Sequence, residues 1–182
     1  MKASTYADDA SYNDDQQLVV GVDWYNAVAY CLWAKAQLPT EAQWEYAARG
    51  PEGYVYPWEN DFDGTKLNYC DENCTYEWAD KAVDDGYRYT APVGFFPEGR
   101  SWVGALDMAG NVFEWTADWY GGYSAGSLTN PEGTKTGSER VVRGGSQGED
   151  GSRVRSAYRG TGDALKPYRH VGFRCVVMLA HE

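Results

Sequence analysis

The sequence predicts an α+β domain with two short helices, a few short strands and long ordered loops. Both segments with helical periodicity lie within the first 50 residues. From Pro51 onward, glycine, aromatic residues and short apolar stretches alternate, with turn signals every few residues. Aromatic residues make up 15% of the chain, which is enough to hold such loops in place by side-chain packing.

The length and composition indicate one folded domain. A chain of 182 residues with 43% hydrophobic residues can close a single core. We expect residues 1–17 to form a loosely held polar lead-in and residues 18–182 to form the domain. No apolar stretch approaches the roughly 18 residues of a membrane span, and the first residues lack the apolar segment of a signal peptide. We therefore expect no membrane insertion and favour the cytoplasm.

The charge is negative overall but divided unevenly along the chain. The net charge is −11; residues 1–139 carry 8 Lys and Arg against 23 Asp and Glu, whereas residues 140–182, the basic tail, carry 8 against 4. Binding to nucleic acid needs a positive field, so the acidic balance argues against a nucleic-acid partner. We expect the arginines of the tail to pair with the acidic body.

The first helix is predicted over residues 24–35. Residues 18–22 form a short apolar run, which we expect to be a strand or an extended approach to the helix. Asp23 is a suitable N-cap, and Leu38-Pro39 ends the segment. Apolar side chains recur at i, i+3, i+4 and i+7, which predicts one buried helix face. Its members are Ala27, Tyr30, Cys31 and Ala34.

The second helix is predicted over residues 41–49 by a capping box. In this motif the Thr40 hydroxyl accepts from the Gln43 amide while the Gln43 side chain reaches back, and Gly50 stops the helix. We expect its partly buried side chains to be Trp44, Tyr46 and Ala47. Strands are predicted over residues 113–117, 140–144 and 172–179.

The four cysteines do not define a metal site. Cys70 and Cys74 have the spacing of half a zinc site, but no second pair of Cys or His complements them. The only histidines in the sequence are His170 and His181. From the cysteine count alone, disulfides and free thiols both stay open.

Several motifs in a fixed order make the chain resemble a known family. They run from Val20 to Ala34 and from Leu38 to Gly50, and continue with Tyr-Pro-Trp at 56–58, Thr-Ala-Pro-Val at 90–93, Leu-Asp-Met-Ala-Gly-Asn-Val-Phe-Glu-Trp at 106–115, Arg-Gly-Gly-Ser at 143–146 and Gly-Phe-Arg-Cys at 172–175. Together they resemble the formylglycine-generating enzyme (sulfatase-modifying factor) family over residues 18–177. The resemblance implies an elaborated C-type-lectin-like fold with two short helices, small twisted antiparallel sheets and long ordered loops. The family's domain normally opens with early strands before the segment that matches Val20, and this chain has almost none of them.

The chain departs from the family at the catalytic cysteines. The oxidase members bind copper through two nearby cysteines and oxidise a substrate cysteine with dioxygen. By the resemblance, Ser156 stands at the second cysteine, within the Arg-Ser-Ala-Tyr-Arg run at 155–159, and Gly151 lies near the first. A serine hydroxyl cannot replace a thiolate as a soft Cu(I) ligand. We therefore expect no copper and no oxidase activity.

Two other chemistries also lack their residues. The family's iron-dependent sulfoxide synthases use a histidine cluster, which two histidines near the C-terminus cannot supply. Ser156 as a hydrolytic nucleophile would need His170 as its base and an orienting acid, and no nucleophile-elbow pattern surrounds it. We interpret Ser156 as a small residue packed under the tail.

The resemblance implies structural calcium at two sites in the loops. One would use the side chains of Asn68 and Asp85 with the carbonyls of Tyr69 and Tyr87. The other would use Asp107 and Glu114 with the carbonyls of Gly110 and Val112. Hard oxygen ligands in glycine-rich turns suit this ion, and turn capping is the alternative role of each Asp.

The resemblance also implies a disulfide. In secreted relatives, a cysteine at the position of Cys31 pairs with one at the position of Cys175, which would cross-link the first helix to the last strand. In a reducing compartment the same two residues would be adjacent buried thiols. Cys70 and Cys74 either pair locally or stay free.

Without the cysteine pair, we expect binding rather than catalysis. Relatives that lack the cysteines include the variable proteins of diversity-generating retroelements, whose C-terminal segment is mutated between fixed Gly-Gly-Ser, arginine and Gly-Phe-Arg motifs. The layout of this tail is similar to that pattern, with rigid aromatic and adaptable polar residues between the motifs. We therefore predict a display module that binds a protein or small-molecule ligand through residues 147–170. The predicted surface is Gln147, Glu149, Asp150, Ser152, Tyr158, Thr161, Asp163, Leu165, Tyr168 and His170.

Three alternatives stay beside this prediction. The chain could be an oxidoreductase of the sulfatase-modifying type with its chemistry elsewhere. It could be a structural or regulatory domain appended to a bacterial kinase or surface protein. Residues 147–170 could also be an ordinary solvated loop.

Overall fold

The computed structural model describes residues 4–9, 11, 12 and 14–177. At its centre is a four-stranded sheet with the strand order β3-β2-β1-β4. The strands are β1 Phe113–Trp119, β2 Arg140–Arg143, β3 Arg159–Gly162 and β4 Val171–Phe173. The helices are α1 Trp24–Trp33 and α2 Glu41–Arg49, with short 3₁₀ turns at Gly64–Lys66 and Pro97–Gly99. Most of the remaining described chain is loop, as predicted.

The sheet is mixed rather than purely antiparallel. β2 pairs antiparallel with β1 and with β3, whereas β4 runs parallel to β1. Residues 163–170 cross from β3 at one edge of the sheet to the opposite edge, so β4 enters in the direction of β1. The predicted third strand is therefore short, and beyond it Val176 makes an isolated bridge with Gln37. Residues 178 and 179 of that prediction lie outside the described residues.

The sequence analysis missed β3 because two of its four residues are glycine. Both glycines are needed for close packing. A Cβ on Gly160 would lie 2.8 Å from Val142 Cγ2, and a Cβ on Gly162 would lie 2.4 Å from the Trp115 ring. The strand therefore depends on neighbours that are distant in sequence, which no local pattern reveals.

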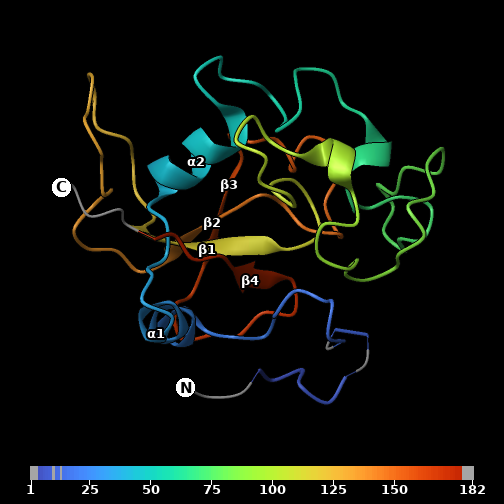
Figure 1. Ribbon diagram of the computed structural model, residues 1–182, viewed down its shortest axis with the longest axis horizontal. Helices are drawn as coiled ribbons and strands as arrows, with labels where there is room; N and C mark the ends of the chain where they lie inside the picture. Colours follow the sequence, from blue (N-terminus) through green and yellow to red (C-terminus); the bar gives the residue numbers. More distant parts are fainter. Residues whose placement is uncertain (1–3, 10, 13, 178–182) are drawn as a thin grey trace.

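The two helices cover opposite faces of the sheet (Figure 1). Successive side chains of a strand point to opposite faces. Phe113 and Trp115 of β1 pack in the hydrophobic cluster that includes α1. Glu114 and Asp118 point the other way and accept hydrogen bonds from the Trp44 indole and the Glu41 amide of α2, at 2.7 and 2.6 Å.

Helix α1 is shorter than predicted and buries fewer side chains. The Asp23 carboxylate caps its first turn by accepting from the Asn26 amide. The chain leaves the helix before Lys35, whose φ of 58° lies in the left-handed region. Ala27 and Cys31 are buried, but Tyr30 is 43% exposed and Ala34 is also exposed. The predicted four-residue face was wrong in these two positions; the Tyr30 ring lies at the surface against Trp33 and Phe173.

Helix α2 has the predicted bounds and the predicted capping box. Trp44 is buried, but Tyr46 is 55% exposed, so its predicted partial burial was wrong. The ring of Tyr46 instead packs edge-on against Trp102 on the surface, at 5.1 Å between centroids. The buried positions of α2 also include Glu41, whose charge needs a partner.

Two arginines approach the Glu41 carboxylate, and one of them, Arg143, is fully buried at the end of β2. Arg143 donates to Glu45, lies 3.4 Å from Glu41 and donates to the carbonyls of residues 156–158. Arg159 approaches the Glu41 carboxylate with two nitrogens, at 2.5 and 2.7 Å. We call Glu41, Glu45, Arg143 and Arg159 the Arg143 cluster. The predicted pairing of tail arginines with the acidic body is confirmed here.

The chain has two disulfides, one between residues distant in sequence and one within a short loop. Cys31 bonds to Cys175, which ties α1 to the chain that follows β4 across a separation of 144 residues. By the loop-entropy model, closing so long a loop contributes about 4–5 kcal/mol. Cys70 bonds to Cys74 and closes a small loop.

The lead-in is held more firmly than expected. Tyr12 is only 7% exposed and packs in a cluster with Val20 and Val112. Its ring lies 5.2 Å from that of Tyr89. Residues 18–20 belong to no strand, and Gln17 makes an isolated bridge with Pro92.

We predict that Arg143→Ala lowers the free energy of unfolding by about 3–5 kcal/mol, because it breaks a buried ion pair and leaves the carbonyls of residues 156–158 without their donor. Urea unfolding measures this loss. The matched control is Arg153→Ala, whose ion pair with Glu149 is half exposed; it should cost less than about 1 kcal/mol. Equal losses in the two variants would show that the Arg143 cluster is not the stabilising contact.

Candidate functional site

The tail lines a cavity of about 400 Å³ together with three other segments. Three predicted surface residues, Gln147, Glu149 and His170, lie in its wall. The opposite wall comes from the lead-in and from two loops that precede β1. We call this cavity the tail pocket. Its lining residues are Tyr12, Cys74, Thr75, Tyr76, Trp78, Arg88, Tyr89, Ser146, Gln147, Gly148, Glu149, Arg153, Arg169 and His170.

A glycine pair turns the chain from β2 into this pocket. Gly144 and Gly145 have φ angles of 96° and 77°, which favour glycine. A Cβ on Gly145 would also lie 2.7 Å from Val154 Cγ1. The next residues are held in place by the backbone N–H of Gln147, which donates to the backbone carbonyl of Asn111 at 3.0 Å. The Gly-Gly-Ser motif therefore acts as a rigid support for the pocket wall.

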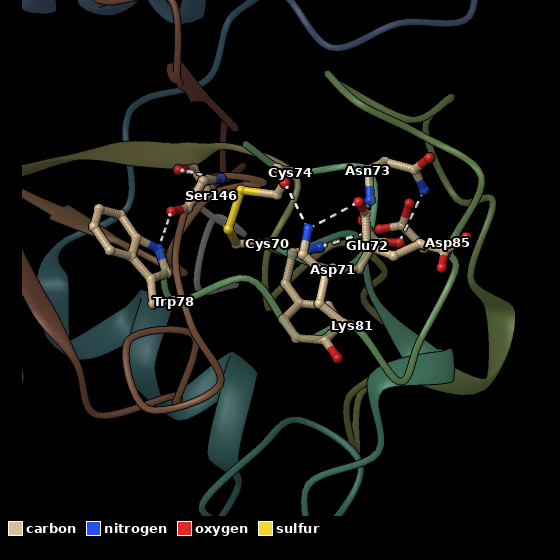
Figure 2. The surroundings of a disulfide bond; sticks show 11 residues. Cys70, Asp71, Glu72, Asn73, Cys74, Trp78, Lys81, Asp85 and Ser146 are labelled. Carbon is tan, nitrogen blue, oxygen red and sulfur yellow. Dashed lines mark hydrogen bonds between the residues drawn. A yellow bond between two sulfur atoms is a disulfide. The ribbon is translucent and has the colours of Figure 1, made fainter. Parts of the chain in front are cut away.

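The loop closed by Cys70 and Cys74 is fastened to the tail by two hydrogen bonds. The Cys70 amide donates to the Glu149 carbonyl at 3.0 Å, and the Trp78 indole donates to the Gly148 carbonyl at 3.0 Å. Figure 2 shows the disulfide between Trp78 and Ser146 on one side and Asp71 and Asp85 on the other. The disulfide loop thus holds the pocket wall in place.

Aromatic rings form much of the pocket's apolar surface. Tyr76 and Trp78 are stacked, with centroids 4.6 Å apart and an interplanar angle of 16°. Both rings are about half exposed. Such rings offer large, rigid contact area at low entropic cost to binding.

The charged groups of the pocket are mainly basic. Arg88, Arg153 and Arg169 face a single carboxylate, Glu149, which lies 3.1 Å from Arg153. Burial lowers the pKa of the His170 imidazole; Glu149 opposes this shift and Arg169 adds to it. The ring is therefore neutral at pH 7.

Other predicted surface residues lie outside the pocket. Asp150 and Ser152 bond to each other in their own turn. Thr161 is exposed on β3, and Asp163 accepts from the Leu165 amide at 3.0 Å. Leu165 is 73% exposed and lines none of the cavities described here. The structure therefore does not bring these five residues together with Gln147, Glu149 and His170.

Tyr158 and Tyr168 are packing residues in this structure. Both are half-buried against the cluster that contains Phe113 and Trp115. The Tyr168 hydroxyl also accepts from the Asp163 amide at 3.1 Å. The sequence analysis placed the two rings on the ligand surface because aromatic residues between polar ones are typical of binding loops. The sequence does not predict that the sheet covers one side of each ring.

Ser156, which the resemblance places at the family's second cysteine, and Gly151, which it places near the first, have packing roles. Ser156 is buried, and its hydroxyl makes no hydrogen bond with any described residue. Its amide donates to the Val55 carbonyl at 2.8 Å. A Cβ on Gly151 would lie 3.1 Å from the Phe62 ring. All four cysteines of the chain are in disulfides.

The first predicted calcium set contains an unsatisfied oxygen. Asn68 Oδ1 is buried and accepts no hydrogen bond from the described residues. Asp85 accepts from the Tyr87 amide at 2.7 Å and from the Tyr69 amide at 3.3 Å. Burial raises the pKa of Asp85 to about 7, and the buried carboxylate of Asp71 adds to this shift. A cation there would supply the missing positive charge, so these residues fit the ion.

The second predicted set is already occupied by protein groups. Glu114 accepts from Arg174 at 2.5 and 2.7 Å and from the Trp44 indole. Asp107 accepts from the Gly94 amide at 2.8 Å. Burial raises the pKa of Asp107. Because Arg174 already balances Glu114, this set gives no sign of a missing cation. Among the described residues, no three His, Cys, Asp or Glu side chains gather in a way that could hold a metal ion.

A larger cavity, of about 780 Å³, lies between α2 and the loop after β1. The carboxylates at its floor are engaged: Glu41 and Glu45 belong to the Arg143 cluster, and Asp118 accepts the Glu41 amide. None of the ten predicted ligand-binding residues lines it. We therefore place the candidate site in the tail pocket.

Only three of the fourteen residues that line the tail pocket were predicted from the sequence, namely Gln147, Glu149 and His170. Tyr12, Tyr76, Trp78 and Arg88 come from segments far from the tail. The only local signal was the density of aromatic residues, which does not say which rings meet.

No helix in the described part of the chain is both long and apolar enough to cross a membrane.

Comparison with known proteins places this geometry in a family. The model of the "Sulfatase-modifying factor enzyme 1-like domain" matches residues 3–179. Formylglycine-generating enzyme of Bos taurus is 38% identical over 167 residues, which cover 86% of this chain and 43% of that protein. Inactive C-alpha-formylglycine-generating enzyme 2 of Mus musculus is 39% identical over 165 residues, which cover 86% of this chain and 48% of that protein. The chain thus spans less than half the length of these relatives.

The fold has a close counterpart among solved structures. Treponema denticola variable protein 1 superposes with a TM-score of 0.75 at 22% identity, covering 95% of this chain and 76% of that one. Sequence identity does not separate the relative named as an enzyme from the one named inactive. Family membership is nonetheless clear, because the family model spans nearly the whole chain and the motifs occupy the expected elements. The chain belongs to the sulfatase-modifying factor enzyme 1-like domain family.

Proposed function

We propose that this chain is a non-catalytic ligand-binding domain whose binding site is the tail pocket. The observation that carries the proposal is the pocket itself: tail residues Gln147, Glu149 and His170 meet exposed aromatic rings around a cavity of about 400 Å³. Pockets of this size hold small ligands or a side chain of a protein partner. The wall is rigid, because a glycine turn and a disulfide loop support it, and rigidity lowers the entropic cost of binding.

The non-catalytic part rests on the cysteine positions. Ser156 is buried under the tail, and Gly151 packs against Phe62. Neither supplies a thiolate, and the chain has no cysteine between Cys74 and Cys175. Copper oxidation of a substrate thiol has no soft ligand pair at these positions.

The likeness to a variable protein supports a second element of the proposal, diversification of the tail. Arg143, Arg159 and Arg174 hold the scaffold together, whereas Gln147 and Glu149 form a pocket wall that packing constrains less. Substitutions at wall positions would change the ligand without loss of the fold.

Binding should depend on the pocket wall and not on the rest of the tail. We expect Gln147→Ala and His170→Ala to weaken a ligand selected from a peptide or fragment library by at least about tenfold, or about 1.4 kcal/mol. Leu165→Ala is the matched control and should bind as the parent does. Calorimetry measures the affinities, and melting curves check the fold.

Retained affinity in both pocket variants would reject the tail pocket as the site. Oxygen uptake with copper and a cysteine peptide, above the rate of a protein-free blank, would contradict the non-catalytic part. Tyr158→Ala and Tyr168→Ala do not test the proposal, because both rings are packed against the core.

Diversification predicts a specific pattern in the genome. We expect a reverse transcriptase gene and a repeat of the tail sequence near the gene for this protein. Sibling sequences should differ at Gln147, Glu149 and His170 and keep Arg143 and Arg174. Sequencing of the locus checks this, and variation spread evenly over wall and scaffold positions would exclude it.

We also propose one structural calcium ion at Asn68 and Asp85, with the carbonyls of Tyr69 and Tyr87. Chelator should lower the melting temperature by several degrees, and added calcium should restore it, because an ion at 100 times its Kd stabilises by about 2.7 kcal/mol. Asp85→Asn should abolish the response. Asp163→Asn, which alters an exposed turn, should keep it. A melting curve that ignores chelator in the parent protein would rule the ion out.

A further inference from the structure

The tail pocket concentrates positive charge on a strongly acidic protein. The chain has a net charge of −11. Three arginines and one glutamate line the pocket, and the His170 ring is neutral. Among the described residues that line the pocket, Glu149 is the only carboxylate, so the lining keeps a positive balance. Asp9 of the lead-in acts electrostatically on Tyr12, which also lines the pocket.

Most arginines of the tail are engaged by other groups of the protein, and in the pocket itself Arg153 is paired with Glu149. Arg143, Arg159 and Arg174 are paired with Glu41, Glu45 or Glu114. Arg155 donates to the Ser152 carbonyl. Each of these four is therefore used by the scaffold.

Two pocket arginines have no such use. Arg169 makes no hydrogen bond or ion pair with any described residue, although it lies close enough to Tyr12 and His170 to act on both electrostatically. Arg88 only faces the ring of its neighbour Tyr89, at 5.6 Å from the centroid. Both arginines are exposed and line one pocket, so their guanidinium groups are available to an anionic partner.

A third group in the wall is also unsatisfied. Gln147 Oε1 is buried and accepts no hydrogen bond from the described residues. Burying such an acceptor costs free energy unless a donor reaches it. A ligand that meets the whole wall therefore carries a donor as well as a negative group.

We infer that the tail pocket takes a small anionic ligand: a carboxylate, sulfate or phosphate group held by Arg88 and Arg169, with a hydroxyl or amide donor for Gln147 and a flat apolar part for Tyr76 and Trp78. This inference rests on the proposed function and names the class of its ligand. Planar guanidinium groups suit all three anions, and stacked aromatic rings suit a flat partner.

A matched charge series tests the inference. The probes are 4-hydroxybenzoate, neutral 4-hydroxybenzamide and cationic 4-hydroxybenzylamine, which share a ring and a hydroxyl donor. Binding is followed by NMR through the imidazole resonance of His170, one of only two histidines in the chain. We expect the anion to bind at least tenfold tighter than the amide and the amine not to bind. The double variant Arg88→Gln/Arg169→Gln should reduce the affinity for the anion to that for the amide.

The control variant is Arg100→Gln/Lys135→Gln, which also removes two positive charges, both exposed and paired with Glu98 and Glu132 outside the pocket. It should bind the anion as the parent does, which separates a local effect from a change in net charge. Equal affinity for anion and amide, or no shift of His170 with any probe, would overturn the anionic class. Library ligands that still depend on Gln147 and His170 would then leave the proposed function standing. Library ligands independent of both residues would instead reject the pocket as the site.

Discussion

The buried charge of Arg143 is the constraint on which the scaffold depends. A guanidinium group with no exposed surface must be neutralised and must have its donors satisfied. Two glutamates of α2 and three carbonyls of the tail meet this need for the two terminal nitrogens, whereas Arg143 Nε has no hydrogen-bond partner among the described residues. One side chain thereby fixes α2 against β2 and holds residues 156–158 beneath both. Arg159 adds a second guanidinium to the same Glu41 and ties β3 to this cluster.

Some arginines of the tail are paired with the body and others are not, which explains how the tail can be rigid and still line an open pocket. Its paired arginines are bound to the body, so the backbone between them is held at fixed points. Gly144 and Gly145 then turn the chain outward, and the Cys70–Cys74 loop supports it through the Glu149 carbonyl. The residues left over, among them Arg169 and Gln147, have unsatisfied polar groups that face a cavity. Such groups are where a scaffold can bind a partner without losing stability.

Family membership does not fix the activity of this chain. The same fold is shared with a relative named as an enzyme, a relative named inactive and a variable protein, and fold alone does not decide among their roles. The side chains of the candidate site carry more information. Ser156 and Gly151 are packed against other parts of the chain, and aromatic and basic residues line the neighbouring pocket. The function is therefore proposed from these residues and not from the scaffold that holds them.

The features that rest on local interactions can be predicted from the amino-acid sequence without the tertiary structure. The Asp23 cap, the Thr40–Gln43 capping box and the apolar runs of β1 and β2 each act within a few residues, so α1, α2 and two strands could be predicted. Tertiary structure alone decided the rest, because the contacts are long-range. The glycines of β3 are explained only by their close contacts with Val142 and Trp115. Tyr158 and Tyr168 are half-covered by a sheet that the neighbouring sequence does not predict. The tail pocket forms only when Tyr12, Trp78 and His170 come together in the fold. Local sequence patterns do not predict which distant side chain will neutralise an arginine. That pairing distinguishes the arginines of the scaffold from those left free at the candidate site.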